Sequence, residues 1–195
     1  MNRKLLALGP ALIMGGVMSG CTATTQTTDA GAGASFSDGN FQVAEIAPSD
    51  RGEPVQFEGV IETGETVTSD DYRGEVLVVN FWYAACGPCI VEAPMLEEVF
   101  LRFQNEEVDF LGVNTYDQAE TALSFARENN VTYPSVIDVN DGQVKLAFAQ
   151  LTPIQATPTT LVMDRQGRLA ARIIGQLPSA SILSTIVADT LAERP

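Results

Sequence analysis

Two cysteines, Cys86 and Cys89, are the residues whose type and spacing point most directly to chemistry. They are separated by Gly87 and Pro88 and are followed by apolar residues at helical spacing. If Cys86 is the N-cap of that helix, Pro88 falls in the first turn, where a missing N–H is tolerated. The N–H of Cys89 can then donate to the Cys86 sulfur, and the positive end of the helix dipole favours its thiolate form. The spacing predicts a redox pair, with Cys86 exposed and nucleophilic and Cys89 within disulfide reach behind it.

Other uses of two closely spaced cysteines fit this sequence less well. A disulfide that closes so short a loop constrains the unfolded chain by only about 2 kcal/mol, so it is a weak structural crosslink. A zinc site needs three or four ligands, whereas the chain has 3 cysteines and no histidine. Covalent haem attachment requires a histidine after the second cysteine, where Ile90 stands. The absence of histidine also excludes histidine-dependent hydrolase triads, and we expect neither a metal nor another cofactor.

The segments around the cysteines alternate between strand and helix patterns. Val76 to Trp82 is a continuous apolar run rich in β-branched residues and predicts a strand buried on both faces. Helix, strand and helix patterns follow at 87–104, 108–113 and 119–129. This order is a βαβ unit and requires parallel strands. Further elements are predicted at 134–139 (strand), 146–154 (helix and loop), 159–163 with 169–174 (hairpin), from Ser179 (terminal helix) and at 54–68 (hairpin).

The segment 78–94, VVNFWYAACGPCIVEAP, resembles the active-site segment of the thioredoxin superfamily, in particular of the exported TlpA/ResA-like thiol–disulfide oxidoreductases. The CGPC tetrapeptide is typical of the superfamily, while N-F-W before it and E-x-P after it are typical of the exported branch. The resemblance covers roughly residues 41–193. It implies an α/β, thioredoxin-like fold, in which a central mixed sheet carries helices on both faces and a β-hairpin at 54–68 forms an N-terminal extension.

The resemblance implies a role for each residue near the cysteines. Cys86 would be the attacking thiolate and Cys89 the resolving thiol, and the two would form the redox disulfide. Resolution needs a base for the Cys89 proton; many thioredoxin-like proteins place an Asp in the central strand for this, where Asn80 stands here. Glu92 lies one helical turn beyond Cys89 and matches the acid–base glutamate of the CxxCxxExP motif. Spacing alone leaves open that Glu92 is an ordinary solvated helix residue.

Four residues are expected to contact a substrate. In thioredoxin-like folds, the strand expected at 159–163 begins with a cis-proline that faces the cysteines. The sequence A-T-P-T at 156–159 matches that motif, so the resemblance implies a cis bond between Thr157 and Pro158. The Thr157 backbone would then pair with an extended substrate segment. Trp82 and Tyr83 are expected to flank the reactive sulfur and shape the docking surface, with core packing as the open alternative for Trp82.

The N-terminal residues predict export and lipidation. Residues 1–20 combine a short charged region with an apolar run too short for a comfortable membrane span, which is typical of a signal peptide. The sequence M-S-G-C at 18–21 resembles a bacterial lipobox, with Met where Leu is usual, and implies lipidation of Cys21. A plain signal peptide that leaves Cys21 free is the alternative. Residues 21–40, rich in Thr, Gly, Ala and Ser, predict a flexible tether to a domain at 41–195.

These patterns predict a lipid-anchored thiol–disulfide oxidoreductase on the extracytoplasmic face of a bacterial cell membrane. The resemblance implies that it reduces disulfides of exported proteins, such as apocytochrome c, with electrons from a membrane thiol donor of the CcdA or DsbD type; a monomer is expected. The formal net charge of −14 argues against nucleic acid as a partner. A Dsb-like oxidant is one alternative, since the tetrapeptide does not fix the reduction potential. Thiol peroxidase is another, although Tyr83 stands where peroxiredoxins place Thr or Ser; a metal carrier or docking module is a third.

Overall fold

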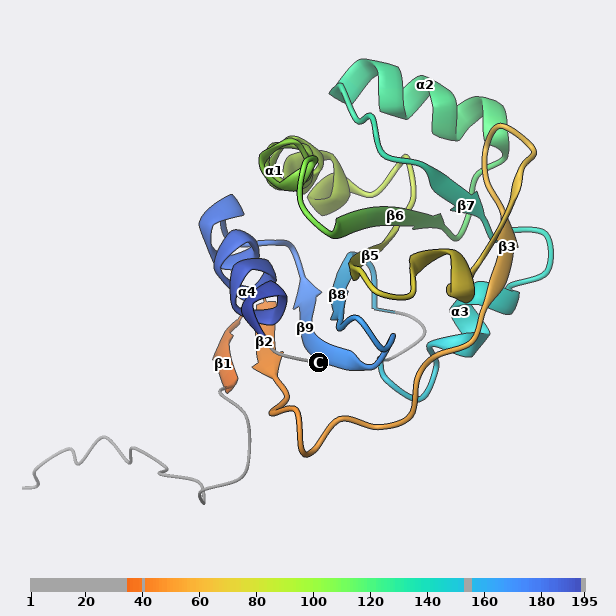
Figure 1. Ribbon diagram of the computed structural model, residues 1–195. Coiled ribbons are helices and arrows are strands. Elements are labelled where there is room, and N and C mark those ends of the chain that lie inside the picture. Colours follow the sequence, from red (N-terminus) through yellow and green to blue (C-terminus); the bar gives the residue numbers. More distant parts are fainter. Residues whose placement is uncertain (1–34, 40, 153–155, 194–195) are drawn as a thin grey trace, which may run out of the picture.

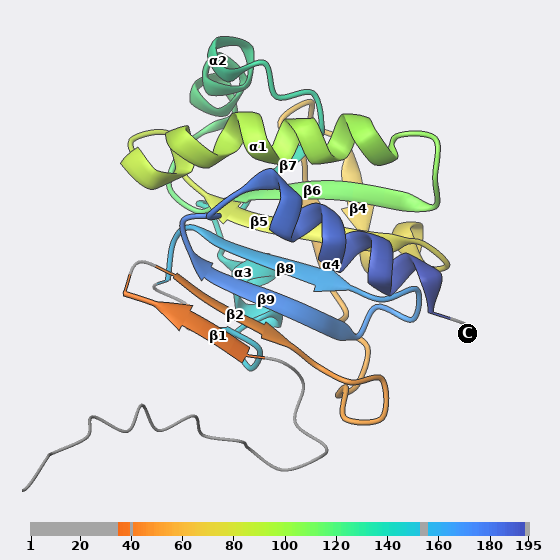
Figure 2. The ribbon, with the colours of Figure 1, turned by 90° about the vertical axis from the view of Figure 1, so that its left-hand side faces the viewer.

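The computed structural model describes residues 35–39, 41–152 and 156–193, and in it a seven-stranded mixed sheet forms the centre of the molecule (Figures 1 and 2). The strand order is β1-β2-β9-β8-β5-β6-β7. Strand β5 (Val76–Trp82) pairs in parallel with β6 (Val108–Asn114) and antiparallel with β8 (Thr159–Met163). The other strands of this sheet are β1 (Ser35–Asp38), β2 (Phe41–Glu45), β7 (Ser135–Ile137) and β9 (Leu169–Gly175).

Alternating side chains of β5 divide the core into two layers. Val76 and Val78 face α1 (Gly87–Phe103) and α4 (Ala180–Ala192), whose apolar residues belong to the same buried cluster. Leu77, Val79 and Phe81 face the opposite layer, which contains α3 (Gln143–Ala147). Helix α2 (Ala119–Asn129) lies beside α1 (Figure 1). Because side chains alternate along a strand, Asn80 and Trp82 also point to the α1 layer.

Apart from the bounds of α3, the predicted strands and helices from residue 76 onward are confirmed, and so are the βαβ unit and the helices on both faces of the sheet. Helix α3 differs from the expectation, since it begins at Gln143 rather than 146. The Asp138 carboxylate accepts the N–H groups of Val144 (2.8 Å) and Lys145 (3.0 Å) and so caps this short helix from a distance. A cap separated by several residues from its helix leaves no local sequence signal, which explains the shift.

The N-terminal part has one hairpin more than expected. The hairpin predicted at 54–68 is confirmed as a separate two-stranded sheet of β3 (Glu58–Val60) and β4 (Thr66–Thr68). Strands β1 and β2 form a second hairpin that extends the main sheet next to β9. Strand β1 lies inside the stretch predicted to be a tether, so the end of that stretch is ordered by pairing. The predicted signal peptide, Cys21 and the rest of the tether lie outside the described residues.

A buried ionic cluster connects the start of the domain to its last helix. The Arg51 side chain, 3% exposed, donates to Asp164 (3.0 Å) and to both oxygens of Glu193 (2.6 Å each). Arg168 also pairs with Asp164. Among the helices that the structure describes, none is both long and apolar enough to cross a membrane.

Candidate active site

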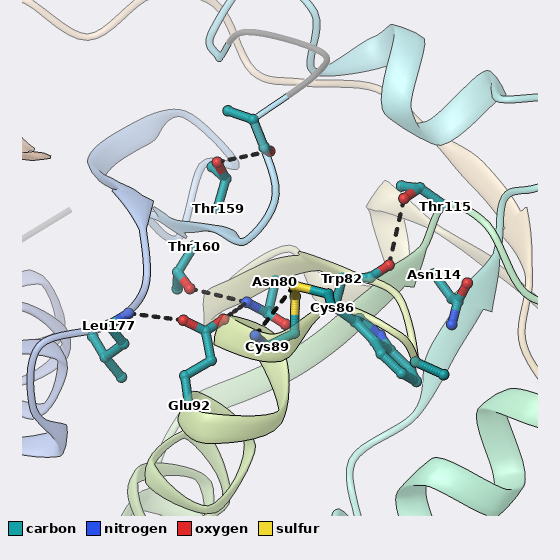
Figure 3. Close-up of a disulfide and its surroundings, with 12 residues drawn as sticks. Asn80, Trp82, Cys86, Cys89, Glu92, Asn114, Thr115, Thr159, Thr160 and Leu177 are labelled. Atoms are coloured by element: carbon teal, nitrogen blue, oxygen red, sulfur yellow. Dashed lines mark hydrogen bonds between the residues drawn. A yellow bond between two sulfur atoms is a disulfide. The ribbon is translucent and has the colours of Figure 1, made fainter. Parts of the chain in front are cut away.

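The disulfide between Cys86 and Cys89 lies at the N-terminus of α1, directly beyond the carboxyl end of β5 (Figure 3). Cys86 is the N-cap, as predicted, and its sulfur accepts the N–H of Cys89 at 3.2 Å. Pro88 occupies the first turn, where its missing N–H leaves no helical hydrogen bond unmade. The local sequence therefore suffices to place both sulfurs at the positive end of the helix dipole.

The expectation that Cys86 is exposed is wrong. Its relative exposure is 3%, close to the 2% of Cys89, and both residues pack in one cluster with Trp82 and Phe125. Neighbouring side chains therefore cover Cys86 in the disulfide form. A partner sulfur must consequently enter a covered site or displace a neighbouring side chain.

Glu92 is fully buried one turn along α1 and holds together three separate elements (Figure 3). One carboxylate oxygen accepts from Asn80 Nδ2 at 2.8 Å, and the other accepts the N–H of Leu177 at 2.8 Å. Asn80 Nδ2 also donates to Thr160 Oγ1 at 3.1 Å. The alternative of a solvated surface glutamate is thereby excluded.

Burial and hydrogen bonding act on Glu92 in opposite directions. Burial raises the pKa of its carboxyl group, while the bonds from Leu177 and Asn80 lower it, and the balance raises this pKa to about 7. A carboxyl group with a pKa near neutrality can both take up and release a proton under ordinary conditions. Asn80 occupies the strand position where many thioredoxin-like proteins place an Asp. Here it does not act as the base but donates a hydrogen bond to the Glu92 carboxylate.

A small cavity of about 10 Å³ lies beneath Cys89. Its lining includes Asn80, Trp82, Tyr133 and Ser135, which carry polar atoms as well as apolar surface. A space of this size has room for about one water molecule. The space beneath the inner sulfur is therefore mostly apolar, with a few polar atoms on the side of the sheet.

Asp117 is a site residue that the sequence analysis missed. Its carboxylate accepts the N–H of Ala84 at 2.6 Å and Asn114 Nδ2 at 3.0 Å. Thr115 donates its N–H to the carbonyl of Trp82 at 3.1 Å. These bonds fasten the loop before Cys86 to the end of β6. The carboxyl ends of parallel β5 and β6 meet at one edge of the sheet. The predicted βαβ unit therefore already implied that the loop after β6 lies beside the cysteines.

The two aromatic residues before the cysteines have different environments. Trp82 is 6% exposed, donates Nε1–H to Ser135 Oγ at 3.2 Å and packs on Phe125 with ring centroids 4.4 Å apart. Trp82 is therefore a core residue, as the alternative expected, and it packs in the same buried cluster as the two cysteines. Tyr83 is half-buried, and its ring lies 4.9 Å from that of Tyr116, which is 69% exposed.

The Thr157–Pro158 peptide bond is cis, as predicted. Phe81 pairs with Thr159 across antiparallel β5 and β8, so the register places Pro158 opposite Trp82, next to the loop that carries Cys86. Pro158 is buried and Thr157 is half-buried. The structure thus brings together all the predicted site residues within the described part of the chain, while their contact with a substrate remains a prediction.

This chain is similar to known proteins that include thiol-disulfide oxidoreductases. The model of the AhpC/TSA family matches residues 52–172. The chain is 33% identical over 112 residues to the thiol-disulfide oxidoreductase ResA of Geobacillus thermodenitrificans; the match covers 57% of this chain and 62% of ResA, less than two thirds of that relative.

Solved structures give a similar result over a larger share of the chain. A DsbF homologue from Corynebacterium diphtheriae is 27% identical, with a TM-score of 0.67 over 75% of this chain and 92% of that chain. A secreted thiol-disulfide isomerase from Corynebacterium glutamicum is 22% identical, with a TM-score of 0.71 over 77% of this chain and 92% of that chain. The second likeness concerns the fold alone and bears out the predicted thioredoxin-like architecture.

Proposed function

Because the chain belongs to the AhpC/TSA family, we propose that it is a thiol–disulfide oxidoreductase that reduces disulfides of exported proteins. The observation that carries this proposal is the Cys86–Cys89 disulfide at the N-terminus of α1, with a buried acid one turn away. The similarity to ResA and to a DsbF homologue supports the reaction class.

The proposed cycle transfers two electrons and begins from the reduced pair. The Cys86 thiolate attacks one sulfur of the partner disulfide, whose S–S bond breaks and releases a partner thiolate. Glu92 accepts the Cys89 proton, and the Cys89 thiolate attacks the Cys86 sulfur of the mixed disulfide. The second partner thiolate leaves, and the disulfide seen in the structure forms. A thiol donor then restores both cysteines.

The reduction potential of the Cys86–Cys89 pair tests the direction of this reaction. Equilibration with a thiol redox buffer should give a value near that of thioredoxin, about −270 mV, or at least well below about −200 mV. A value near about −120 mV would identify a disulfide donor like DsbA and would overturn the reductase proposal.

A thiol peroxidase is distinguished by its rate with peroxide. We expect slow peroxide consumption, because Tyr83 stands three residues before Cys86 where peroxiredoxins place a hydroxyl-bearing Thr or Ser. A Cys89→Ser variant should accumulate a mixed disulfide between Cys86 and a partner protein, since the resolving thiol is missing. Rapid peroxide turnover without trapped partners would favour the peroxidase.

We further propose that Cys21 is lipidated and holds the protein on the outer face of the cell membrane. Exported proteins such as apocytochrome c would be its substrates, a CcdA- or DsbD-type membrane protein its electron donor, and a monomer its working state. A Cys21→Ala variant should move from the membrane fraction to the soluble fraction. Retention of that variant in the membrane would contradict anchoring through Cys21.

A further inference from the structure

A groove of about 670 Å³ runs along α2 beside the start of α1. Residues along the length of α2 line one wall, and Ala84 and Ile90 contribute from the segment around the cysteines. Phe125 lines the groove and also packs in the cluster that contains Cys86 and Cys89. The groove is therefore continuous with the wall of the disulfide site.

Exposed apolar side chains follow Cys89 in the chain or lie against the loop before Cys86, and one of them, Ile90, lines the groove. Ile90 is 44% exposed and Val91 is 52% exposed, and both directly follow Cys89. Tyr116, 69% exposed, lies against Tyr83, which belongs to the loop before Cys86. Large apolar side chains left in solvent around one reactive site indicate a surface that a partner covers.

The groove carries negative charge without a compensating cation. Glu120 and Glu128 line it, and no Lys or Arg is among its lining residues. Neither carboxylate takes part in an ion pair within the described part of the chain. Ser124 Oγ donates to Glu128 Oε1 at 3.2 Å, which helps to hold that carboxylate in place. A cationic side chain of a partner would complement this field.

We infer that the groove along α2 binds an extended segment of the partner polypeptide, with Lys or Arg side chains on Glu120 and Glu128 and apolar residues near Ile90. The inference rests on the proposed function, because the partner is the protein whose disulfide reacts with Cys86. The burial of Cys86 favours an extended segment, since a narrow chain can reach a covered sulfur more easily than a folded surface can.

Helix geometry sets the spacing of the partner's cations. Glu120 and Glu128 are eight positions apart, which separates them by about 12 Å along α2 and by about 80° around its axis; both still line the groove. An extended chain covers about 13 Å in four residues, and residues i and i+4 point to the same side. Cations at i and i+4 therefore match the two carboxylates, whereas cations at i and i+3 point to opposite sides.

Synthetic disulfide peptides of identical composition test this spacing. One peptide carries lysines at i and i+4 and the other at i and i+3. Each spacing is made in two versions, with the lysine pair before or after the cysteine. The reduced protein should react about two- to fivefold faster with the i, i+4 peptide at low salt, because that peptide can form one more exposed ion pair than the i, i+3 peptide. This preference should disappear at about 1 M salt, where the Debye length is about 3 Å, and in a Glu120→Gln/Glu128→Gln variant.

A matched variant separates the groove from the general charge of the protein. Glu98→Gln/Glu106→Gln removes the same number of charges from exposed positions outside the groove and should keep the preference. Equal rates for both peptides with the unmodified protein, or equal loss in both variants, would overturn the groove while leaving the oxidoreductase intact. Failure to reduce either peptide or any small-molecule disulfide would instead overturn the proposed function, and the inference with it.

Discussion

Glu92 is where the chemistry of single residues can be tested most directly, because its folded environment changes its protonation. The unfolded chain releases this proton near the ordinary pKa of 4.5, whereas the folded protein keeps it up to about 7. Between these values the folded state binds more protons, so its stability falls as pH rises. The neutral carboxyl group therefore contributes fully to the free energy of unfolding below about pH 4.5, and this contribution is lost as pH rises through about 7.

Replacement of Glu92 by Gln should therefore change the pH dependence of stability. Relative to the unmodified protein, the free energy of unfolding of Glu92→Gln should increase by about 2–3 kcal/mol between about pH 5 and pH 8, because the amide does not ionise. Denaturant unfolding of the oxidised proteins at both pH values measures this. Glu98→Gln, at an exposed position of the same helix, should show little change. A difference independent of pH would contradict the raised pKa.

The same substitution should alter the reaction rate in a characteristic way. If Glu92 takes the Cys89 proton, the rate of mixed-disulfide resolution should rise with pH through about 7. Glu92→Gln should resolve the mixed disulfide about 100-fold or more slowly, within the usual range for a lost general base, and without this rise. Stopped-flow measurement of thiol release across the pH range tests the role. Unchanged rates in the variant would assign Glu92 to packing alone.

Asp117 is expected to position the loop that carries Cys86. Asp117→Ala would leave the Ala84 N–H without its acceptor and should lower the free energy of unfolding by about 1–3 kcal/mol. It should also shift the reduction potential of the cysteine pair, which a remote structural defect would leave unchanged. Asp117→Asn keeps an acceptor oxygen and should restore most of both properties; failure of this rescue would implicate the charge instead.

Residue types and spacing were sufficient to predict the cysteine pair, because both residues lie at the start of one helix. Glu92 was predicted only through its match to the CxxCxxExP motif, since its spacing alone left its role open. The partners of Glu92 could not be predicted from the sequence in the same way. Asn80 comes from β5 and the Leu177 N–H from the segment before α4, and only folding brings them together. The burial of Cys86 was missed for the same reason, since Phe125 belongs to another helix.

At the scale of elements, β6 and β7 approach closely at Gly112 and Ser135, next to the Trp82 indole. An added Cβ at Gly112 would clash with Ser135 Oγ and would lie 2.8 Å from Trp82 Nε1. These are the two atoms of the hydrogen bond that holds the indole. The close packing of these elements therefore depends on the absence of a side chain at this position.

Gly112→Ala should lower the free energy of unfolding by about 1–3 kcal/mol, as expected for overpacking in a dense core. It should also weaken the Trp82–Ser135 hydrogen bond, which near-ultraviolet circular dichroism of the indole would report. Gly52→Ala adds a Cβ that meets no atom within 4 Å and serves as the control. Equal stability of both variants would contradict the described packing.

Sequence periodicity predicted the elements of the central unit well because their burial is regular. Val76 to Trp82 reads as a buried strand and is buried along its whole length. Strand β1 escaped prediction because its residues are all exposed, so it has neither an apolar run nor an alternating pattern. Its order comes from pairing with β2, which is a tertiary property.

At the scale of the whole molecule, the Arg51 cluster connects segments at both ends of the domain. Arg51→Ala should lower the free energy of unfolding by about 3 kcal/mol or more, because Asp164 would remain buried with fewer partners. Chemical denaturation measures this loss. Arg102→Ala, at an exposed position in the last turn of α1, should cost about 1 kcal/mol or less. Comparable losses in the two variants would contradict a structural role for the cluster.

Trp82 gives the molecule an optical property that follows from its position. It is the single tryptophan of the chain, and its indole packs in the cluster formed around the disulfide. An excited indole transfers an electron readily to a nearby disulfide, which quenches its emission, whereas a pair of thiols quenches it less. Fluorescence should therefore rise when the cysteines are reduced, and one unlabelled emission signal would follow every turnover in real time.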